Sequence, residues 1–390
     1  MWPRDVAWVL ASGATWTFTI ALALYAYYEE GPAGVGLAVA VRVLPAALVA
    51  PRARTLVDRT PARYVLAASA AARALGLAGI ALCVALDLPL VVVLALVAAF
   101  RVAGAADRWA YAALDPRFDG TPMALRRAEV SRRRLDEVGF LAGALVAGVC
   151  VSVAGLDVVF AICAGAFVAA AAVALRSPAG APSPRSEESM AGARVALERI
   201  DARRLLLARG GPAAARAVVE LLLVIAAIDV LGMGDGGVGW LSAAWAVGLV
   251  AGTRVLRARG QTPSVRTVGT SCALAGAPLA LLALAPPPAV ALVLLTVLGL
   301  GFALAREAER AVEHRCPPGA PLDGGQIVDA LARTAGSMVA ASLVLLLGAE
   351  AALAAAGALV TALGLVAVGA FQGGAEEEPA ARVAAVPQGP

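Results

Sequence analysis

Long apolar segments alternate with short polar segments along almost the whole chain. Each apolar segment is about twenty residues long, which is what a helix needs to cross a hydrocarbon core of about 30 Å. Strands of a membrane barrel would instead alternate apolar and polar residues over roughly ten residues. The pattern therefore predicts an all-α integral membrane protein. The twelve predicted helices cover residues 6–28, 33–51, 63–86, 88–112, 136–154, 157–175, 212–231, 236–255, 266–285, 288–306, 326–348 and 350–371.

The predicted helices divide into two groups of six, which we interpret as two six-helix bundles. Residues 1–175 form the N-terminal half and residues 211–372 the C-terminal half. The polar stretch 176–210 mixes arginines and acids with regularly spaced apolar residues, which predicts a cytoplasmic linker with an amphipathic helix. Residues 373–390 contain three consecutive glutamates and three prolines and are predicted to be disordered.

Arginine lies on one side of the predicted helices. The loops on that side carry Arg52, Arg54, Arg59, Arg117, Arg126, Arg127, Arg132, Arg133, Arg134, Arg254, Arg257, Arg259, Arg306, Arg310 and Arg315. The loops on the opposite side carry Glu29, Glu30, Asp87, Asp157 and Asp235. Because basic loops stay in the cytoplasm, we expect both termini to be cytoplasmic and the protein to reside in a bacterial inner membrane.

Composition supports a membrane protein and narrows the choice of partners. Hydrophobic residues make up 61% of the chain and charged residues only 15%, against about 25% charged in a soluble protein. Arginines in the loops on one side explain the net charge of +4. We therefore expect the protein to contact membrane lipids and to bind no nucleic acid. We also expect a monomer. None of the five cysteines has the spacing of a metal site, and we expect neither a metal nor a cofactor.

The loop after the second predicted helix reads Arg54-Thr-Leu-Val-Asp58-Arg59-Thr-Pro-Ala-Arg63. It resembles the cytoplasmic signature Gly-x-Leu-Ala-Asp-Arg-x-Gly-Arg-Arg of the major facilitator superfamily, although Arg54 and Pro61 replace its glycines. The resemblance implies the twelve-helix major facilitator fold. It also implies a cytoplasmic gate in which Asp58, with Arg59 and Arg63, meets the positive N-terminus of the eleventh helix.

Two further segments resemble the drug/proton antiporter branch of this superfamily. Arg101 is followed closely by small residues in the fourth predicted helix. The fifth contains Gly139, Gly143 and Gly148, with Ala144 where the antiporter pattern has proline. The glycine spacing predicts close helix packing. Together these segments imply export of a substrate in exchange for protons.

Charged residues at membrane depth are costly and mark candidate functional sites. Arg42 and Arg101 are the deepest and need an acid on another helix, a water-filled cavity or an anionic ligand. Glu220 is our candidate proton carrier, because a partly apolar cavity disfavours its charged form. Its spacing from Arg216 also suits an ion pair within one helix. Trp16 is deep enough to line a cavity, and contact with lipid fits it equally well.

Charges nearer the cytoplasmic end have structural interpretations. Asp329 and Arg333 are four residues apart and suit an ion pair within a helix. Asp107 belongs, with Arg108, Asp136 and Glu137, to a predicted salt-bridge network with the Asp58 loop. We expect Arg63 to pair with Asp107 or Asp115 in it. The gate set is therefore Asp58, Arg59, Arg63, Asp107, Asp329 and Arg333.

The sequence contains no Walker loop, nucleophile elbow, zinc-protease motif or dinucleotide fingerprint, so we do not expect an enzyme. The main hypothesis is a secondary transporter that exports a small amphipathic or anionic molecule, coupled to protons, by alternating access. One alternative is a lipid or glycolipid flippase. Another is a membrane partner of a second protein that transports nothing itself.

Overall fold

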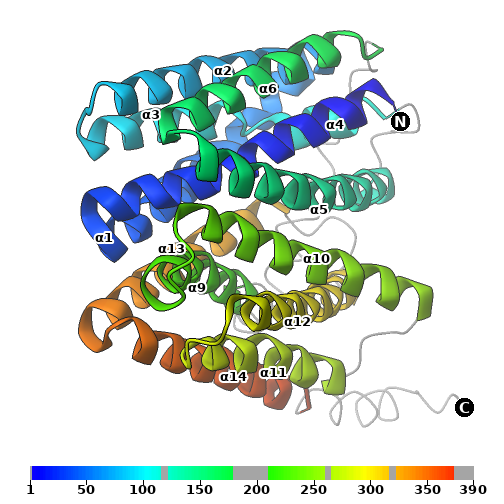
Figure 1. The fold of residues 1–390 in the computed structure, drawn as a ribbon. Coiled ribbons are helices and arrows are strands. Elements are labelled where there is room, and N and C mark those ends of the chain that lie inside the picture. Colours follow the sequence, from blue (N-terminus) through cyan, green and yellow to red (C-terminus); the bar gives the residue numbers. More distant parts are fainter. Residues whose placement is uncertain (1, 116–121, 179–209, 260–264, 316–321, 373–390) are drawn as a thin grey trace, which may run out of the picture.

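The computed structural model describes residues 2–115, 122–178, 210–259, 265–315 and 322–372. These residues form a bundle of roughly antiparallel helices, and no strand occurs among them. Figure 1 shows the helices up to α6 stacked above those from α9 onward. The chain is thus divided into an N-terminal and a C-terminal half. The predicted linker helix and tail fall almost entirely outside the described residues.

Among the described residues, the N-terminal half contains six helices, and the first of them is folded back on itself. They are α1 (Pro3–Arg59), α2 (Ala62–Ala85), α3 (Leu90–Ala103), α4 (Asp107–Ala113), α5 (Pro122–Val153) and α6 (Leu156–Leu175), with α3 and α4 in series. Inside α1, Glu30 and Gly31 leave helical geometry, and Gly31 has φ 60° and ψ −149°. That region of backbone space is essentially restricted to glycine. The break divides α1 into the first and second predicted helices.

The C-terminal half repeats this arrangement. It contains α9 (Gly211–Ile225) continued by the π-helical turn η2 (Ala226–Val230), then α10 (Asp235–Arg259), α11 (Val265–Leu282), α12 (Pro288–Arg315), α13 (Leu322–Leu347) and α14 (Ala349–Gln372). Eight helical segments of the described chain are long and apolar enough to cross a membrane. The predicted all-helical membrane fold is therefore confirmed. The order of elements accommodates twelve spans, and that count stays a prediction.

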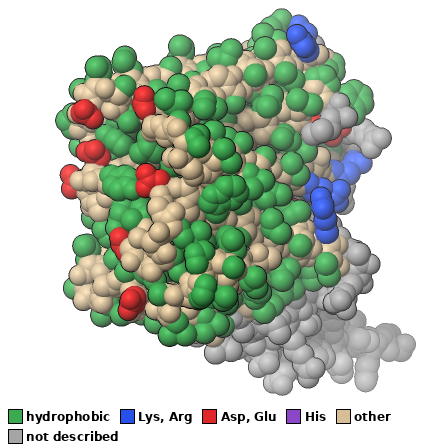
Figure 2. Space-filling view, in the orientation of Figure 1, with side chains coloured by type: hydrophobic (Ala, Val, Ile, Leu, Met, Phe, Trp, Pro, Cys, Tyr) green, Lys and Arg blue, Asp and Glu red, His purple; other side chains and the backbone are tan. Residues whose placement is uncertain are grey.

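Charge divides the surface into two ends. Figure 2 shows acidic side chains at one end of the bundle and arginines at the other, with a broad hydrophobic belt between them. We call the end with Arg52, Arg59, Arg176 and Arg254 the arginine-rich face, and the end with the loops at Glu29–Glu30, Asp87, Asp157 and Asp235 the acidic face. The belt is the surface that lipid would cover.

The two halves touch along α5 and α10 near the acidic face. A methyl group on Gly239 of α10 would lie 2.2 Å from the backbone nitrogen of Gly148 on α5, so only glycine allows this approach. Gly139 and Gly143, the other two glycines of the predicted packing motif, instead face α1. Gly143 lies against Gly13 and Thr17, and the Thr17 hydroxyl donates to its carbonyl oxygen at 2.9 Å.

Candidate functional site

A cavity of about 570 Å³ lies between the two halves and opens on the arginine-rich face. Its walls include the first turns of α1 at Ala7 and Trp8, the start of α5 at Glu129, and Arg306 of α12. None of the acidic-face loops lines it. Arg101, Arg216, Arg333 and Trp16 reach its deep end. Among the predicted pathway residues, Arg101 and Trp16 therefore face a common cavity.

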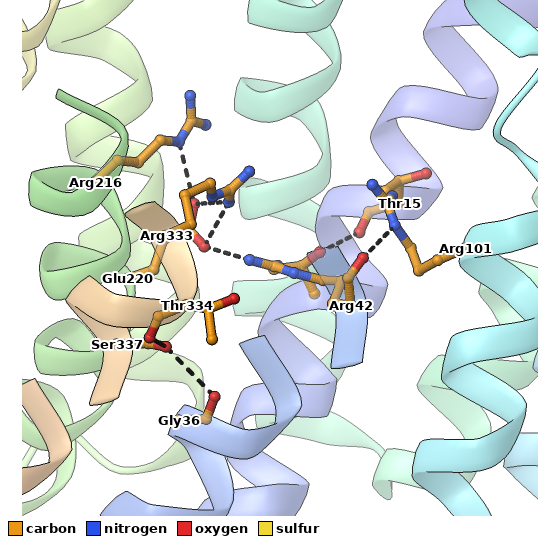
Figure 3. Close-up of polar contacts among 10 residues, drawn as sticks. Thr15, Gly36, Arg42, Arg101, Arg216, Glu220, Arg333, Thr334 and Ser337 are labelled. Carbon is orange, nitrogen blue, oxygen red and sulfur yellow. Dashed lines mark hydrogen bonds and ion pairs between the residues drawn. The ribbon is translucent and has the colours of Figure 1, made fainter. Parts of the chain in front are cut away.

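Three arginines converge on Glu220 at the deep end of the cavity (Figure 3). Arg333 of α13 donates to both carboxylate oxygens, at 2.9 and 3.1 Å. Arg216, one turn before Glu220 on α9, donates from Nε at 3.1 Å. Arg42 of α1 donates to Oε2, which also accepts from Arg333. Three arginines against one glutamate leave a formal excess of two positive charges.

A fourth guanidinium lies beside this cluster. Arg101 of α3 donates from Nε to the backbone oxygen of Arg42 at 2.8 Å (Figure 3). This bond fixes Arg101 next to Arg42 without adding a negative charge. We call Arg42, Arg101, Arg216, Arg333 and Glu220 the arginine cluster.

A row of aromatic rings crosses from one half to the other beside the cluster. The ring centroids of Trp16 and Phe140 are 4.3 Å apart, those of Phe140 and Trp245 5.4 Å, and those of Trp245 and Phe302 5.4 Å. The Arg216 guanidinium lies 5.0 Å from the Trp16 ring, within range of a cation–π interaction. Trp245 is buried, and its indole N–H has no hydrogen-bond partner among the described residues. It is thus a donor available to a ligand.

A small chamber of about 40 Å³ lies next to the cluster, and apolar side chains form most of its wall. Arg42 and Glu220 line this chamber, whereas Arg216 and Arg333 line the large cavity. The bond between Arg42 and Glu220 joins α1 to α9, and so joins the two halves.

Other contacts join the halves toward the acidic face. The Ser337 hydroxyl of α13 lies 3.4 Å from the Gly36 carbonyl oxygen, which accepts its hydrogen bond (Figure 3). The Tyr27 hydroxyl donates to Asp229 at 2.6 Å, and the Tyr28 hydroxyl donates to Asp235. The passage is therefore open on the arginine-rich face and held together at the acidic face.

A profile of the Major Facilitator Superfamily matches residues 6–308, which is most of the chain. The chain belongs to the major facilitator superfamily. None of the curated protein sequences shows a significant match. Membership makes the chain a multi-pass membrane transporter and not an enzyme, as the sequence predicted.

Solved transporters of known structure share the fold at low sequence identity. The nucleoside transporter NupG is 14% identical with a TM-score of 0.69, covering 95% of this chain and 98% of its own. A bacterial homolog of the human lysosomal transporter Spinster, solved inward-facing and unoccupied, is 12% identical (TM-score 0.68, 94% and 95% covered). A POT family transporter solved with a thioalcohol-conjugated peptide is 12% identical (TM-score 0.63, 93% and 94% covered).

The superfamily's signature loop is exposed in this structure. Asp58 and Arg59 lie at the end of α1, and neither forms a hydrogen bond or ion pair with any described residue. Part of the first turn of α13, the predicted partner, has side chains outside the described set. The predicted contact with α13 stays a prediction.

The expected partners of Arg63 were wrong. Its guanidinium donates to the neighbouring Tyr64 hydroxyl at 2.9 Å. Asp107 instead pairs with Arg73 at 2.8 Å, buried inside the N-terminal half, and Asp115 pairs with Arg4 at 3.0 Å. Sequence spacing could not show the Arg73–Asp107 and Arg4–Asp115 pairs, because each joins residues that are far apart along the chain.

The predicted network of Asp136 and Glu137 with the Asp58 loop was also wrong. Asp136 accepts hydrogen bonds from Trp8, Ser12 and Arg132, at 2.8, 3.1 and 2.6 Å. Glu137 reaches the other half, where the Thr253 hydroxyl donates to it at 3.1 Å. Asp329 lines the cavity near Arg333. Apart from Arg132, which is on the same helix, the partners of Asp136 and Glu137 lie on other helices.

Glu220 does not have the surroundings expected of a proton carrier. Each carboxylate oxygen accepts bonds from guanidinium groups, and a proton on Glu220 would compete with all of them. This geometry suits a counterion for the arginines. The sequence identified Arg216 only as the intrahelical partner of Glu220 and left Trp245 open between lining the cavity and contacting lipid. It missed Phe140, which carries no signal beyond hydrophobicity.

Proposed function

We propose that this protein moves a small anionic molecule across the membrane by alternating access, and that the arginine cluster binds it. The observation that carries the proposal is the excess of positive charge at the deep end of an open cavity. Charged groups at membrane depth are retained where they bind substrate, ions or one another. Here one carboxylate pairs with three arginines, and a fourth arginine lies beside them. A bound anion would neutralise the remaining positive charge.

The two ends of the passage support alternating access. The cavity is open on the arginine-rich face, which we propose is cytoplasmic, and contacts at Tyr27, Tyr28 and Ser337 hold the other end together. Closing one end while opening the other around a fixed central site is how such repeat-built transporters work. We propose a location in a bacterial inner membrane with both termini in the cytoplasm.

We propose export as the direction, because the cavity receives its ligand from the arginine-rich face and the segments at Arg101 and Gly139–Gly148 resemble antiporters. Proton coupling stays a prediction from that resemblance. The three guanidinium partners of Glu220 argue against it as the proton carrier, and we propose that it acts as a counterion instead.

Binding can be tested on the purified protein by titrating the thermal unfolding midpoint with inorganic phosphate, succinate and citrate, one at a time. We expect at least one to stabilise the wild type. Arg333→Gln should weaken its binding about 10-fold or more, because a hydrogen bond to a charged group contributes about 1.5–3 kcal/mol. Arg176→Gln is the matched control, since Arg176 is exposed and lies outside the cavity.

Transport is then measured in proteoliposomes with the anion that binds. We expect Arg101→Gln and Arg333→Gln to reduce uptake while Arg176→Gln keeps it. Stabilisation by neutral or cationic compounds alone, or unchanged binding in both cluster variants, would refute the anion assignment. A preference for lipid-linked anions over their free counterparts would favour the flippase alternative.

A further inference from the structure

We infer that Glu220 is a resident competitor of the transported anion: it occupies the anion subsite while the site is empty, and the substrate displaces it from Arg42. This inference rests on the proposed function. It goes beyond it by assigning Glu220 a role in substrate selection and in joining the halves. The juxtaposition of Arg42, Glu220 and Arg333 between two cavities carries it.

The hydrogen bonds at Glu220 show that the carboxylate, and not the arginines, is saturated. It accepts four hydrogen bonds from three guanidinium groups. A carboxylate offers about four lone-pair sites, whereas each guanidinium has five N–H donors. The Arg333 Nε is buried and has no partner in the described chain. Donor capacity therefore remains for a second carboxylate or a phosphate.

The position of the carboxylate makes displacement possible without unfolding. Glu220 and Arg216 share α9, and Arg333 is on α13 of the same half, whereas Arg42 comes from α1 of the other half. Movement of one half relative to the other would stretch the Arg42–Glu220 bond first. The other two pairs would move as a unit.

The two cavities place the incoming anion correctly for this exchange. An anion entering from the arginine-rich face meets Arg101, Arg216 and Arg333, which line the large cavity. Arg42 and Glu220 form part of the wall of the chamber beyond. An anion that then bonds Arg42 takes over the role of Glu220, and the ion pair that joins the halves is lost at the moment of binding.

Charge balance identifies the class of anion that can do this. The cluster holds four arginines and one glutamate, and a monoanion exchanged for Glu220 at Arg42 would leave most of that excess uncompensated. Burying uncompensated charge as the site closes is costly. A compact dianion or trianion, such as a dicarboxylate or a phosphate ester, fits better than a monoanion.

The test separates competition from direct binding. Glu220→Gln keeps the shape of the side chain and removes its charge. If Glu220 competes with substrate, this variant should bind the anion that stabilises the wild type about 10-fold more tightly, while proteoliposome turnover falls. A residue that only holds the site together would weaken binding when replaced. Glu137→Gln is the matched control for the loss of a buried negative charge, because Glu137 is also buried, also joins the halves and lines the large cavity, but makes no bond to the cluster.

A second comparison, between a double variant and a single variant, keeps the test valid if the Glu220→Gln protein does not fold. Arg42→Gln with Glu220→Gln removes one charge of each sign and is compared with Arg42→Gln alone. We expect the double variant to bind the anion more tightly than the single one. Equal or weaker binding in both comparisons overturns the role of Glu220, even though wild-type binding would stand. If no anion binds the wild type, the proposed function fails and this inference fails with it.

Discussion

Arg73 and Asp107 form a buried ion pair that the proposed binding step does not use. Asp107 accepts at 2.8 Å, and the Arg73 guanidinium lies 5.0 Å from the Phe100 ring and 4.9 Å from the Phe167 ring. Arg73 is thereby held by one carboxylate and two aromatic faces inside the N-terminal half. Its role is to fasten α2 to α4.

We expect Asp107→Leu to destabilise the protein by about 3–5 kcal/mol, because it leaves a buried arginine without its counterion. Replacing both partners, as Arg73→Met with Asp107→Leu, should recover much of that loss. The measurement is the thermal unfolding midpoint in detergent. Asp58→Leu is the control and should change stability little, since Asp58 is exposed. A double variant less stable than Asp107→Leu would contradict a structural ion pair.

Sequence spacing predicted charged contacts only within single helices. The interval of four residues found Arg216–Glu220, which the structure forms at 3.1 Å. It could not find Arg42 or Arg333 as partners of the same carboxylate, since they are 178 and 113 residues away along the chain. Membrane depth indicated that Arg42 needed an acid on another helix, a water-filled cavity or an anionic ligand. Only the packing of α1 against α9 showed that Glu220 pairs with it.

At the scale of elements, the crossing of α5 and α10 sets how the halves meet near the acidic face. The predicted glycine motif pointed to close packing on α5. It did not indicate that Gly139 and Gly143 face α1 whereas Gly148 faces the other half. That division follows from the course of α5, which packs on α1 along part of its length and on α10 along another.

We expect Gly239→Ala to loosen this crossing, because its methyl group would overlap the backbone of Gly148. Backbone atoms cannot rotate away, so the helices must separate. The measurement is hydrogen exchange of α5 and α10 peptides near the acidic face, which should become faster. Gly165→Ala on α6 is the control, since nothing lies within 4 Å of the position its methyl group would occupy. Equal rates of hydrogen exchange in the two variants would show that the crossing of α5 and α10 does not keep the two halves together.

At the scale of the whole molecule, the sequence predicted the helical membrane fold because hydropathy and arginine placement are properties of long segments. It predicted the superfamily because the loop at Asp58 carries a local signature. The length of the apolar segments and the side of the membrane on which arginines lie do not depend on individual side-chain contacts. The open end of the cavity could not be predicted this way. It depends on which contacts form between the two halves. In the sequence, Tyr27 and Tyr28 look like ordinary aromatic residues of a membrane interface.

Two hydroxyl–carboxylate bonds join the halves at the acidic face, at Tyr27–Asp229 and Tyr28–Asp235. Removing both hydroxyls, as Tyr27→Phe with Tyr28→Phe, keeps the rings and removes about 0.5–1.5 kcal/mol per bond, because both bonds are exposed to solvent. The equilibrium between the conformation that is open on the arginine-rich face and the conformation that is open on the acidic face should therefore shift toward the second. We expect a thiol at Val238, which lines the small chamber, to react faster with an impermeant maleimide added from that face.

The control for this experiment is Tyr25→Phe, in an otherwise cysteine-free background carrying the same Val238→Cys probe. The Tyr25 hydroxyl donates to the Leu88 carbonyl oxygen at 3.1 Å within the N-terminal half, so its loss should leave the rate of labelling unchanged. An increase of several-fold in the double variant alone would assign the gate to the bonds between halves. Equal rates in all three proteins would mean that helix packing at α5–α10 and α1–α13, and not these hydroxyls, keeps the acidic face closed.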